Sequence, residues 1–146
     1  MDINYHEINQ TESSISYLIL DSNNQPIGSA EGYVGHEELV TVIKINSEYQ
    51  KKGLGFQAFN KIYTELSLKT QISKIAGSWH KDEEFSYCEN NMSTNLRLFH
   101  ENLKKGLTEE KSALNTPTGK WAQRIGYDKC KIKKVTSDDV HVTFYK

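Results

Sequence analysis

The chain has 146 residues, of which 36% are hydrophobic and 25% charged, and its formal net charge is -1. This length predicts one domain that can bury its own core without metals or disulfides. The near-zero net charge excludes a general attraction to nucleic acid or to an anionic membrane. Arginine occurs only at Arg97 and Arg124, so an extended arginine surface for reading phosphates or bases is also excluded.

The targeting and redox signals predict a cytoplasmic protein. The first ten residues, MDINYHEINQ, are polar, and no stretch approaches the roughly 18 apolar residues of a membrane span. Cys88 and Cys130 belong to no CxxC or Cys/His cluster, which favours free thiols over a disulfide or a zinc site. We therefore expect a reducing compartment, no membrane contact and no bound metal.

Apolar and polar residues alternate through the first 45 positions, which predicts an antiparallel meander of strands over residues 15–20, 27–34 and 38–45. A similar pattern with fewer apolar positions predicts an edge strand over residues 4–9.

From Phe56 the period becomes helical, and a helix is expected as far as about Lys69. Residues 73–79, SKIAGSW, then predict a strand that returns parallel to the one ending at Ile45, completing a βαβ unit. Helices and a terminal hairpin are expected to follow. They are helices over residues 93–105, 108–115 and 120–125, the last after an interruption at Pro117 and Gly119, and strands over residues 127–135 and 140–145.

Together these segments predict a single domain, residues 1–146, of the α/β (α+β) class. Its sheet is expected to be mixed and mostly antiparallel, with a central βαβ unit, flanking helices and a C-terminal hairpin.

The corner between the predicted strand 38–45 and the following helix reads Gln50-Lys51-Lys52-Gly53-Leu54-Gly55. Amides at a helix start lack intrahelical acceptors, and glycines allow an anion to come close to them. The spacing does not fit a P-loop. A dinucleotide-binding corner is also disfavoured, because no acidic residue occurs in SKIAGSW, about 20 positions further on.

The corner is similar to the Gln/Arg-x-x-Gly-x-Gly/Ala motif of the GCN5-related N-acetyltransferase (GNAT) superfamily. The resemblance implies that residues 51–56 offer backbone amides to the pyrophosphate of acetyl-CoA, and that Ile43 and Ile45 pair by main chain with its pantetheine arm. A second family element resembles residues 115–127, with Asn115 in its Asn position and Ala122 where a proton-donating Tyr is usual. The residues so assigned to cofactor binding are Ile43, Ile45, Gln50, Lys51, Lys52, Gly53, Leu54, Gly55, Phe56 and Asn115.

The resemblance implies direct attack of an amine on the thioester, so a base is needed and a covalent nucleophile is not. The family position for a strand glutamate is Leu39 here, and Glu37 is expected on the same strand face. His80 and Ser78 leave the end of the strand 73–79 and are the other catalytic candidates. An exposed loop histidine is the alternative interpretation of His80.

Two further features remain open between interpretations. The acidic residues Asp82, Glu83, Glu84 and Glu89 either attract a cationic amine or form a solvated loop. Lys120 and the amides near Gly119 either form a second anion contact or only start the last helix.

The sequence therefore predicts an acetyl-CoA-dependent N-acetyltransferase acting on a primary amine, either a small molecule or a protein lysine or N-terminus. One alternative is a non-catalytic CoA-binding or regulatory module of the same fold. Another is a bacterial toxin or effector acyltransferase acting on a protein or an RNA-linked amine, since residues 95–127 resemble C-terminal toxin modules. The oligomeric state stays open, with a homodimer among the options.

Overall fold

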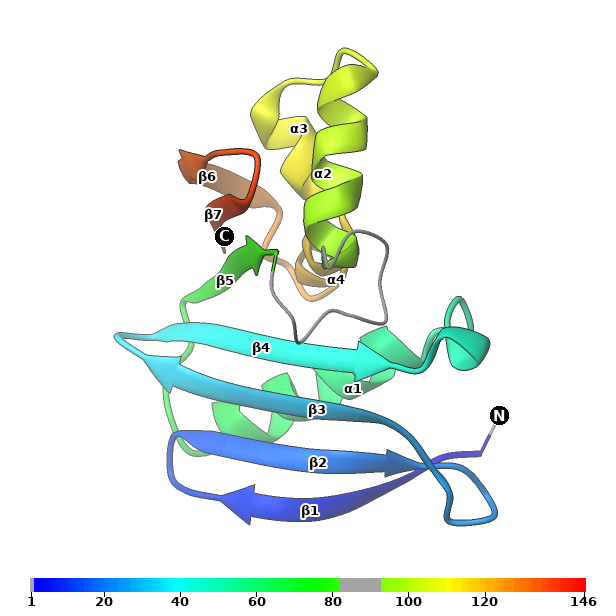
Figure 1. Cartoon of the computed structure of the whole chain (residues 1–146). Helices are drawn as coiled ribbons and strands as arrows, with labels where there is room; N and C mark the ends of the chain where they lie inside the picture. Colours follow the sequence, from blue (N-terminus) through cyan, green and yellow to red (C-terminus); the bar gives the residue numbers. More distant parts are fainter. Residues whose placement is uncertain (1, 82–92) are drawn as a thin grey trace. The chain divides into compact units, whose positions relative to one another are not determined.

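The computed structural model describes residues 2–81 and 93–146, and contacts divide the chain into two compact units, Met1–Ile72 and Ser73–Lys146 (Figure 1). The described residues form seven β-strands and four α-helices, and the strand pairs within each unit are antiparallel. The predicted mixed α/β class is therefore confirmed. No helix in this part of the chain is long and apolar enough to cross a membrane.

The first unit contains a four-stranded antiparallel meander (Figure 1). Its strands are β1 (Asn4–Gln10), β2 (Ser14–Leu20), β3 (Pro26–Gly35) and β4 (Glu38–Ile45). Short turns join all of them, so the predicted meander and its edge strand are confirmed. Only residues 11–13 connect β1 to β2, and no helix lies between these strands.

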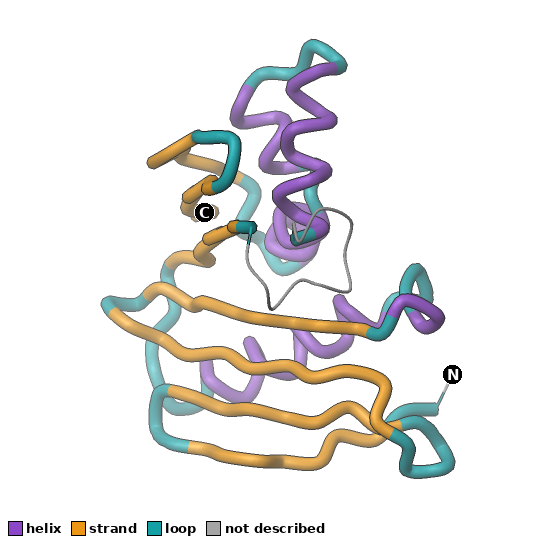
Figure 2. The backbone as a smooth tube through the Cα atoms, in the orientation of Figure 1, coloured by secondary structure: helices purple, strands orange, loops and turns teal. Residues whose placement is uncertain are grey.

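One helix, α1 (Leu54–Ser67), covers a face of this sheet (Figure 2). On β2, Ile15, Tyr17 and Ile19 are buried and alternate with half-buried residues, because successive strand residues face opposite sides. Gly32 on β3 allows the helix to approach closely, since a Cβ there would lie 2.5 Å from Ile62 Cγ2. The buried residues of α1 recur at helical spacing: Leu54, Ala58, Phe59, Ile62 and Leu66.

The second unit combines a three-stranded antiparallel sheet, in the order β5-β7-β6, with three helices. Its elements are β5 (Lys74–His80), α2 (Thr94–Lys104), α3 (Glu109–Leu114), α4 (Pro117–Arg124), β6 (Lys129–Val135) and β7 (Asp139–Tyr145). An aromatic cluster lies in its core, where the Trp79 ring centroid is 6.2 Å from that of Phe99 and 6.3 Å from that of Phe144. The helices predicted over residues 93–105 and 108–115 and the predicted terminal hairpin are confirmed, and Ser93 and Thr108 are the N-cap residues of α2 and α3.

The last helix differs from its prediction, because it begins at Pro117 rather than at Lys120. Proline is well accepted at the first position of a helix, where its missing N–H has no intrahelical role. Thr116 caps the helix by accepting a hydrogen bond from the Gly119 amide at 3.1 Å. Gly119 is buried, and a Cβ there would lie 2.2 Å from the Ala113 carbonyl oxygen. Both residues thus belong to the helix instead of interrupting it.

The predicted strand, helix, strand order around the glycine corner is confirmed as β4, α1 and β5 along the chain. The helix begins at Leu54 and ends at Ser67, instead of spanning Phe56 to Lys69, because Gly53 already serves as its N-cap residue. The motif therefore occupies the connection between β4 and α1 and the first turn of α1.

Candidate cofactor site at the start of the first helix

The turn between β4 and α1 has an unusual backbone. A short 3-10 helix, η1 (Ser47–Tyr49), follows β4, and Lys51 and Gly53 then take left-handed conformations with φ of 63° and 78°. The Gln50 side chain donates a hydrogen bond from Nε2 to the Ile45 carbonyl oxygen at 2.9 Å. This bond ties the turn to the end of β4, so Gln50 sets the shape of the corner.

The N-terminus of α1 differs from those of the other described α-helices. Ser93, Thr108 and Thr116 each accept a hydrogen bond that caps α2, α3 and α4. The N-cap residue of α1 is Gly53, and no side chain of the described residues caps it. The first turn of α1 also has no acidic residue. The start of α1 therefore has no capping side chain within residues 2–81 and 93–146, and it lies at the positive end of the helix dipole.

Two lysines add positive charge beside this helix end. Lys51 and Lys52 are exposed and immediately precede the N-cap residue. A Cβ added at Gly53 would meet nothing within 4 Å, so the space that a side chain of this residue would enter is open. Backbone amides, a helix dipole and lysines together suit a phosphate or another compact anion.

The predicted pantetheine residues lie directly before this corner. Ile43 and Ile45 belong to the last three residues of β4 and are half-buried. They lie opposite Ala30 and Gly28 on β3. The structure thus brings together, within the first unit, every predicted cofactor residue from Ile43 to Phe56.

Glu37 does not lie where the sequence placed it. The sequence predicts Glu37 on the same strand face as Leu39, but β4 begins only at Glu38. The predicted strand position of Glu37 is therefore wrong. His36 and Glu37 form the exposed two-residue turn between β3 and β4, with φ of 52° and 63°. A left-handed residue breaks the alternation of a strand. Leu39 itself is completely buried and offers no base.

Ser78 and His80 both lie on β5, two residues apart and therefore on one face. Ser78 pairs with His141 on β7, and Ser78 Oγ lies 3.5 Å from His141 Nδ1. Sequence reasoning missed His141, because a partner 63 residues away depends on strand register. The polar position within the apolar tail segment VHVTF was the available signal for it.

Asn115 has a local structural role in the second unit. It is the C-cap residue of α3, and its Nδ2 donates a hydrogen bond to the Lys111 carbonyl oxygen at 2.8 Å.

The second anion contact considered near Gly119 is not supported by the start of α4. The Thr118 amide donates to Asn95 Oδ1 at 2.9 Å, and the Gly119 amide donates to Thr116 Oγ1. Because these amides already have acceptors, the alternative interpretation holds, in which this segment starts the helix.

Two observations limit the acids and nucleophiles in the second unit. The residue at the family's tyrosine position is Ala122, so no phenol is present there. Its side chain is completely buried. Cys130 is half-buried, and burial together with the charge of Glu110 raises the pKa of its thiol to about 12. This thiol stays protonated near neutral pH. Asp82, Glu83, Glu84, Cys88 and Glu89 lie outside the described residues.

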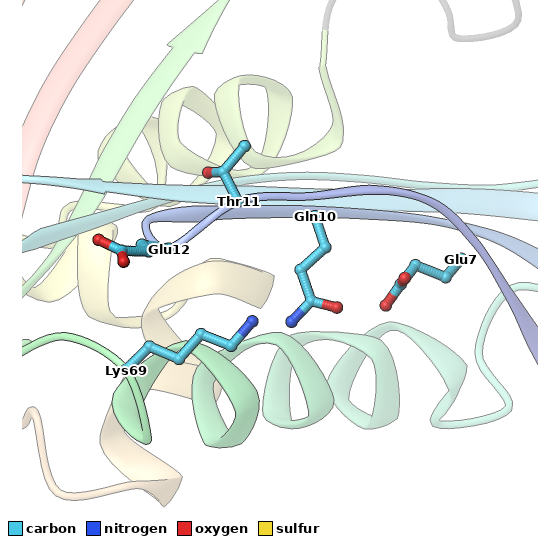
Figure 3. Close-up of a pocket in the computed structure, with 5 residues that line it drawn as sticks. All are labelled: Glu7, Gln10, Thr11, Glu12 and Lys69. Atoms are coloured by element: carbon cyan, nitrogen blue, oxygen red, sulfur yellow. The ribbon is translucent and has the colours of Figure 1, made fainter.

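A separate open pocket lies near the other end of α1 (Figure 3). It is lined by Glu7, Gln10, Thr11, Glu12 and Lys69. With its amide oxygen toward Lys69, Gln10 accepts from the ammonium group and donates to Glu7 Oε1 at 2.6 Å. Glu7, Gln10 and Lys69 thus satisfy one another, and we assign the pocket no ligand. No group of three His, Cys, Asp or Glu side chains among residues 2–81 and 93–146 has the arrangement of a metal site.

No protein-family model and no curated protein sequence matches the chain. Several solved structures, however, are similar to the chain. A candidate acetyltransferase from Exiguobacterium sp. 255-15 is similar with a TM-score of 0.52 and 10% identity, over 99% of this chain and 94% of that one. The PaiA N-acetyltransferase from Thermoplasma acidophilum, in complex with coenzyme A, has a TM-score of 0.50 and 11% identity, over 92% of this chain. The chain spans 62% of the length of that protein.

A third similar structure is an acetyltransferase of the GNAT family from Streptococcus pneumoniae, with a TM-score of 0.50 and 11% identity. The match covers 91% of this chain and 67% of that one. At such identities the likeness concerns the fold. The chain therefore has the fold of the GCN5-related N-acetyltransferases, the superfamily that its glycine corner resembles.

Proposed function

We propose that this protein is an acetyl-CoA-dependent N-acetyltransferase that acts on a primary amine. The observation that carries the proposal is the N-terminus of α1, which has Gly53 in place of a capping side chain and is preceded by Lys51 and Lys52. In a chain of GNAT fold, a helix start of this kind suits the pyrophosphate of CoA. The coenzyme A complex of the Thermoplasma protein supports CoA as the ligand.

In this proposal residues 1–146 act as one acetyltransferase domain, and the predicted residues Ile43 to Phe56 of the first unit bind the cofactor. Amides of residues 51–56 bind the pyrophosphate, while the main chain at Ile43 and Ile45 pairs with the pantetheine arm. Gln50 positions the turn through its bond to the Ile45 carbonyl oxygen. Asn115 would add a contact through its amide oxygen, because its Nδ2 is already bonded to Lys111.

Bound acetyl-CoA supplies the activated acyl group as a thioester. The protein has to accept a proton from the attacking ammonium group and to exclude water from the reacting atoms. Glu37 and His80 are the proposed bases, and Ser78 is a proposed hydroxyl relay. The hydroxyl of Ser78 lies against His141 Nδ1, which gives it a partner for proton exchange.

Calorimetric titration of the full chain with acetyl-CoA tests the binding step. Gly53→Glu should abolish binding, because a carboxylate would replace the pyrophosphate over the helix start. Gly106→Glu is a matched control: Gly106 is also left-handed (φ 96°), and its Cβ would likewise meet nothing within 4 Å. The control should bind as the parent does. Equal affinity in both variants, or no binding by the parent, would overturn the proposed site.

A second candidate is a CoA-binding module without catalysis. Two buried residues favour it, because Ala122 and Leu39 stand where the family often has an acid and a base. Thiol release from acetyl-CoA, measured over a panel of small amines and lysine peptides, separates the two functions. Acceptor-dependent thiol release supports the enzyme. Tight CoA binding without release for any acceptor supports the module.

A further inference from the structure

The strand β6 ends the sheet of the second unit. It pairs with β7 on one side, and no strand among the described residues pairs with it on the other. Half of its backbone amides and carbonyls therefore face outward along an open edge. Such an edge can accept an extended segment of another chain through main-chain hydrogen bonds.

One face of β6 carries a row of lysines. Lys129, Lys131 and Lys134 lie opposite Tyr145, Thr143 and His141 on β7, which places them on the same side of the sheet. A register shift between Ile132 and Lys134 makes Lys133 an extra residue outside this alternation. All four lysines are exposed. None of them forms an ion pair with a carboxylate of the described residues.

The other face of β6 is an apolar row that remains half-open. Cys130, Ile132 and Val135 are only half-buried, although their partners on β7 are buried. Those partners are Phe144, Val142 and Val140. The core of the second unit thus continues to the open edge without being closed there.

We propose that the outer edge of β6 binds an extended segment of a partner protein in which acidic and apolar residues alternate. Acidic side chains of that segment would pair with Lys129, Lys131 and Lys134 on one face. Its apolar side chains would cover Cys130, Ile132 and Val135 on the other face. Because strand side chains alternate with period two, only an alternating sequence satisfies both rows at once.

Lysines on an edge strand also protect it against pairing with further copies of itself. In β6 this protection is selective, because a second β6 strand would bring like charges together while an acidic strand is attracted. Acidic residues of this chain lie at the two ends of the strand, at Asp128 and at Asp138 and Asp139. The basic stretch, and therefore the expected contact, is confined to the seven residues between Lys129 and Val135.

The test uses the full chain, without acetyl-CoA, and a fluorescent peptide of sequence GEVEVEVG followed by anisotropy. A peptide of the same composition with blocked order, GEEEVVVG, is the first control, and a GEVEVEVG peptide with N-methylated backbone is the second. We expect both controls to bind at least about tenfold more weakly, because they lose the alternation or the main-chain bonds. Equal binding of all three peptides would overturn the proposal.

A pair of variants then tests whether binding depends on the lysine row or only on the overall positive charge of β6. Lys131→Glu should weaken binding of GEVEVEVG about tenfold or more, whereas Lys133→Glu, with the same change of charge, should change it less than about threefold. Equal effects, or full competition by an RNA oligonucleotide of equal charge, would show unspecific polyanion binding and overturn the proposal. Neither result bears on acetyl-CoA binding, which is measured separately.

Discussion

The hydroxyl of Tyr17 on β2 donates a hydrogen bond to Glu65 Oε2 on α1, and this bond joins the helix of the first unit to its sheet. Glu65 Oε1 also accepts from Lys61 at 2.7 Å. The Lys61 ammonium lies 5.2 and 5.1 Å from the ring centroids of Tyr5 and Tyr17. Burial is the main cause that raises the pKa of Tyr17, and the hydrogen bond to Glu65 raises it further. The phenol therefore remains a donor at physiological pH. This cluster orients the helix that carries the proposed cofactor site.

Removing the Tyr17 hydroxyl should destabilise the protein. We expect Tyr17→Phe to lower the free energy of unfolding by about 1–2 kcal/mol, because the half-buried carboxylate loses a charged hydrogen bond while the ring packing stays. Urea unfolding followed by fluorescence measures the change. Tyr33→Phe is the matched control, since Tyr33 is 54% exposed, and it should change the unfolding free energy by less than about 0.5 kcal/mol. Equal effects of the two changes would show that the Tyr17 hydrogen bond adds no stability.

The same cluster predicts a loss of stability in acid. Burial raises the pKa of Glu65, but the hydrogen bonds from Lys61 and Tyr17 and the charges of Lys61 and Lys69 outweigh burial and leave the pKa below its ordinary value of 4.5. A depressed folded pKa means that the stabilisation is complete above the unfolded pKa and disappears as the pH falls through the folded one. Unfolding curves measured from about pH 6 to pH 3 should therefore show that the free energy of unfolding falls more steeply with decreasing pH in the parent than in Glu65→Gln. Parallel declines would contradict this assignment.

The lysines beside Gly53 should contribute to acetyl-CoA affinity through charge. We expect Lys51→Ala with Lys52→Ala to weaken binding about tenfold at low salt and to flatten its dependence on salt. The double change Lys104→Ala with Lys105→Ala is the control, because these two lysines are also adjacent and end another helix. Calorimetry at two salt concentrations distinguishes the pairs. An equal loss of affinity in both double variants would point to overall charge instead of the α1 corner.

Gly119 should be required for packing and not for the cofactor. A Cβ at this position would lie 2.2 Å from the Ala113 carbonyl oxygen and 2.8 Å from Leu114 Cα, so α3 and α4 would have to separate. We expect Gly119→Ala to destabilise the chain by about 2–3 kcal/mol or more in thermal or urea unfolding. Gly35→Ala, where a Cβ meets nothing within 4 Å, should cost about 1 kcal/mol or less. Comparable losses would show that the close helix contact is unimportant.

The parts of the fold that were predicted correctly depend on local patterns. Alternation predicted the meander, and helical spacing predicted α1 and α2, because both periods follow from backbone geometry within a few residues. The helix starts predicted at residues 93 and 108 are likewise confirmed, and the structure adds that Ser93 and Thr108 cap them. The start of α4 is predicted wrongly, because proline and glycine usually interrupt helices. Pro117 is compatible with the helix because it occupies the first helical position, and Gly119 because it allows a close contact with α3.

The sequence by itself determined the corner from Ile43 to Phe56, because a strand end, a glycine turn and a helix start follow one another directly along the chain. Tertiary structure alone decided the partners of distant residues. The pairing of Ser78 with His141, the turn position of Glu37 and the lysine row on β6 all depend on strand register and turn geometry. Register is set by how the strands pack against their helices, and a shift of one residue would exchange the two faces of every strand.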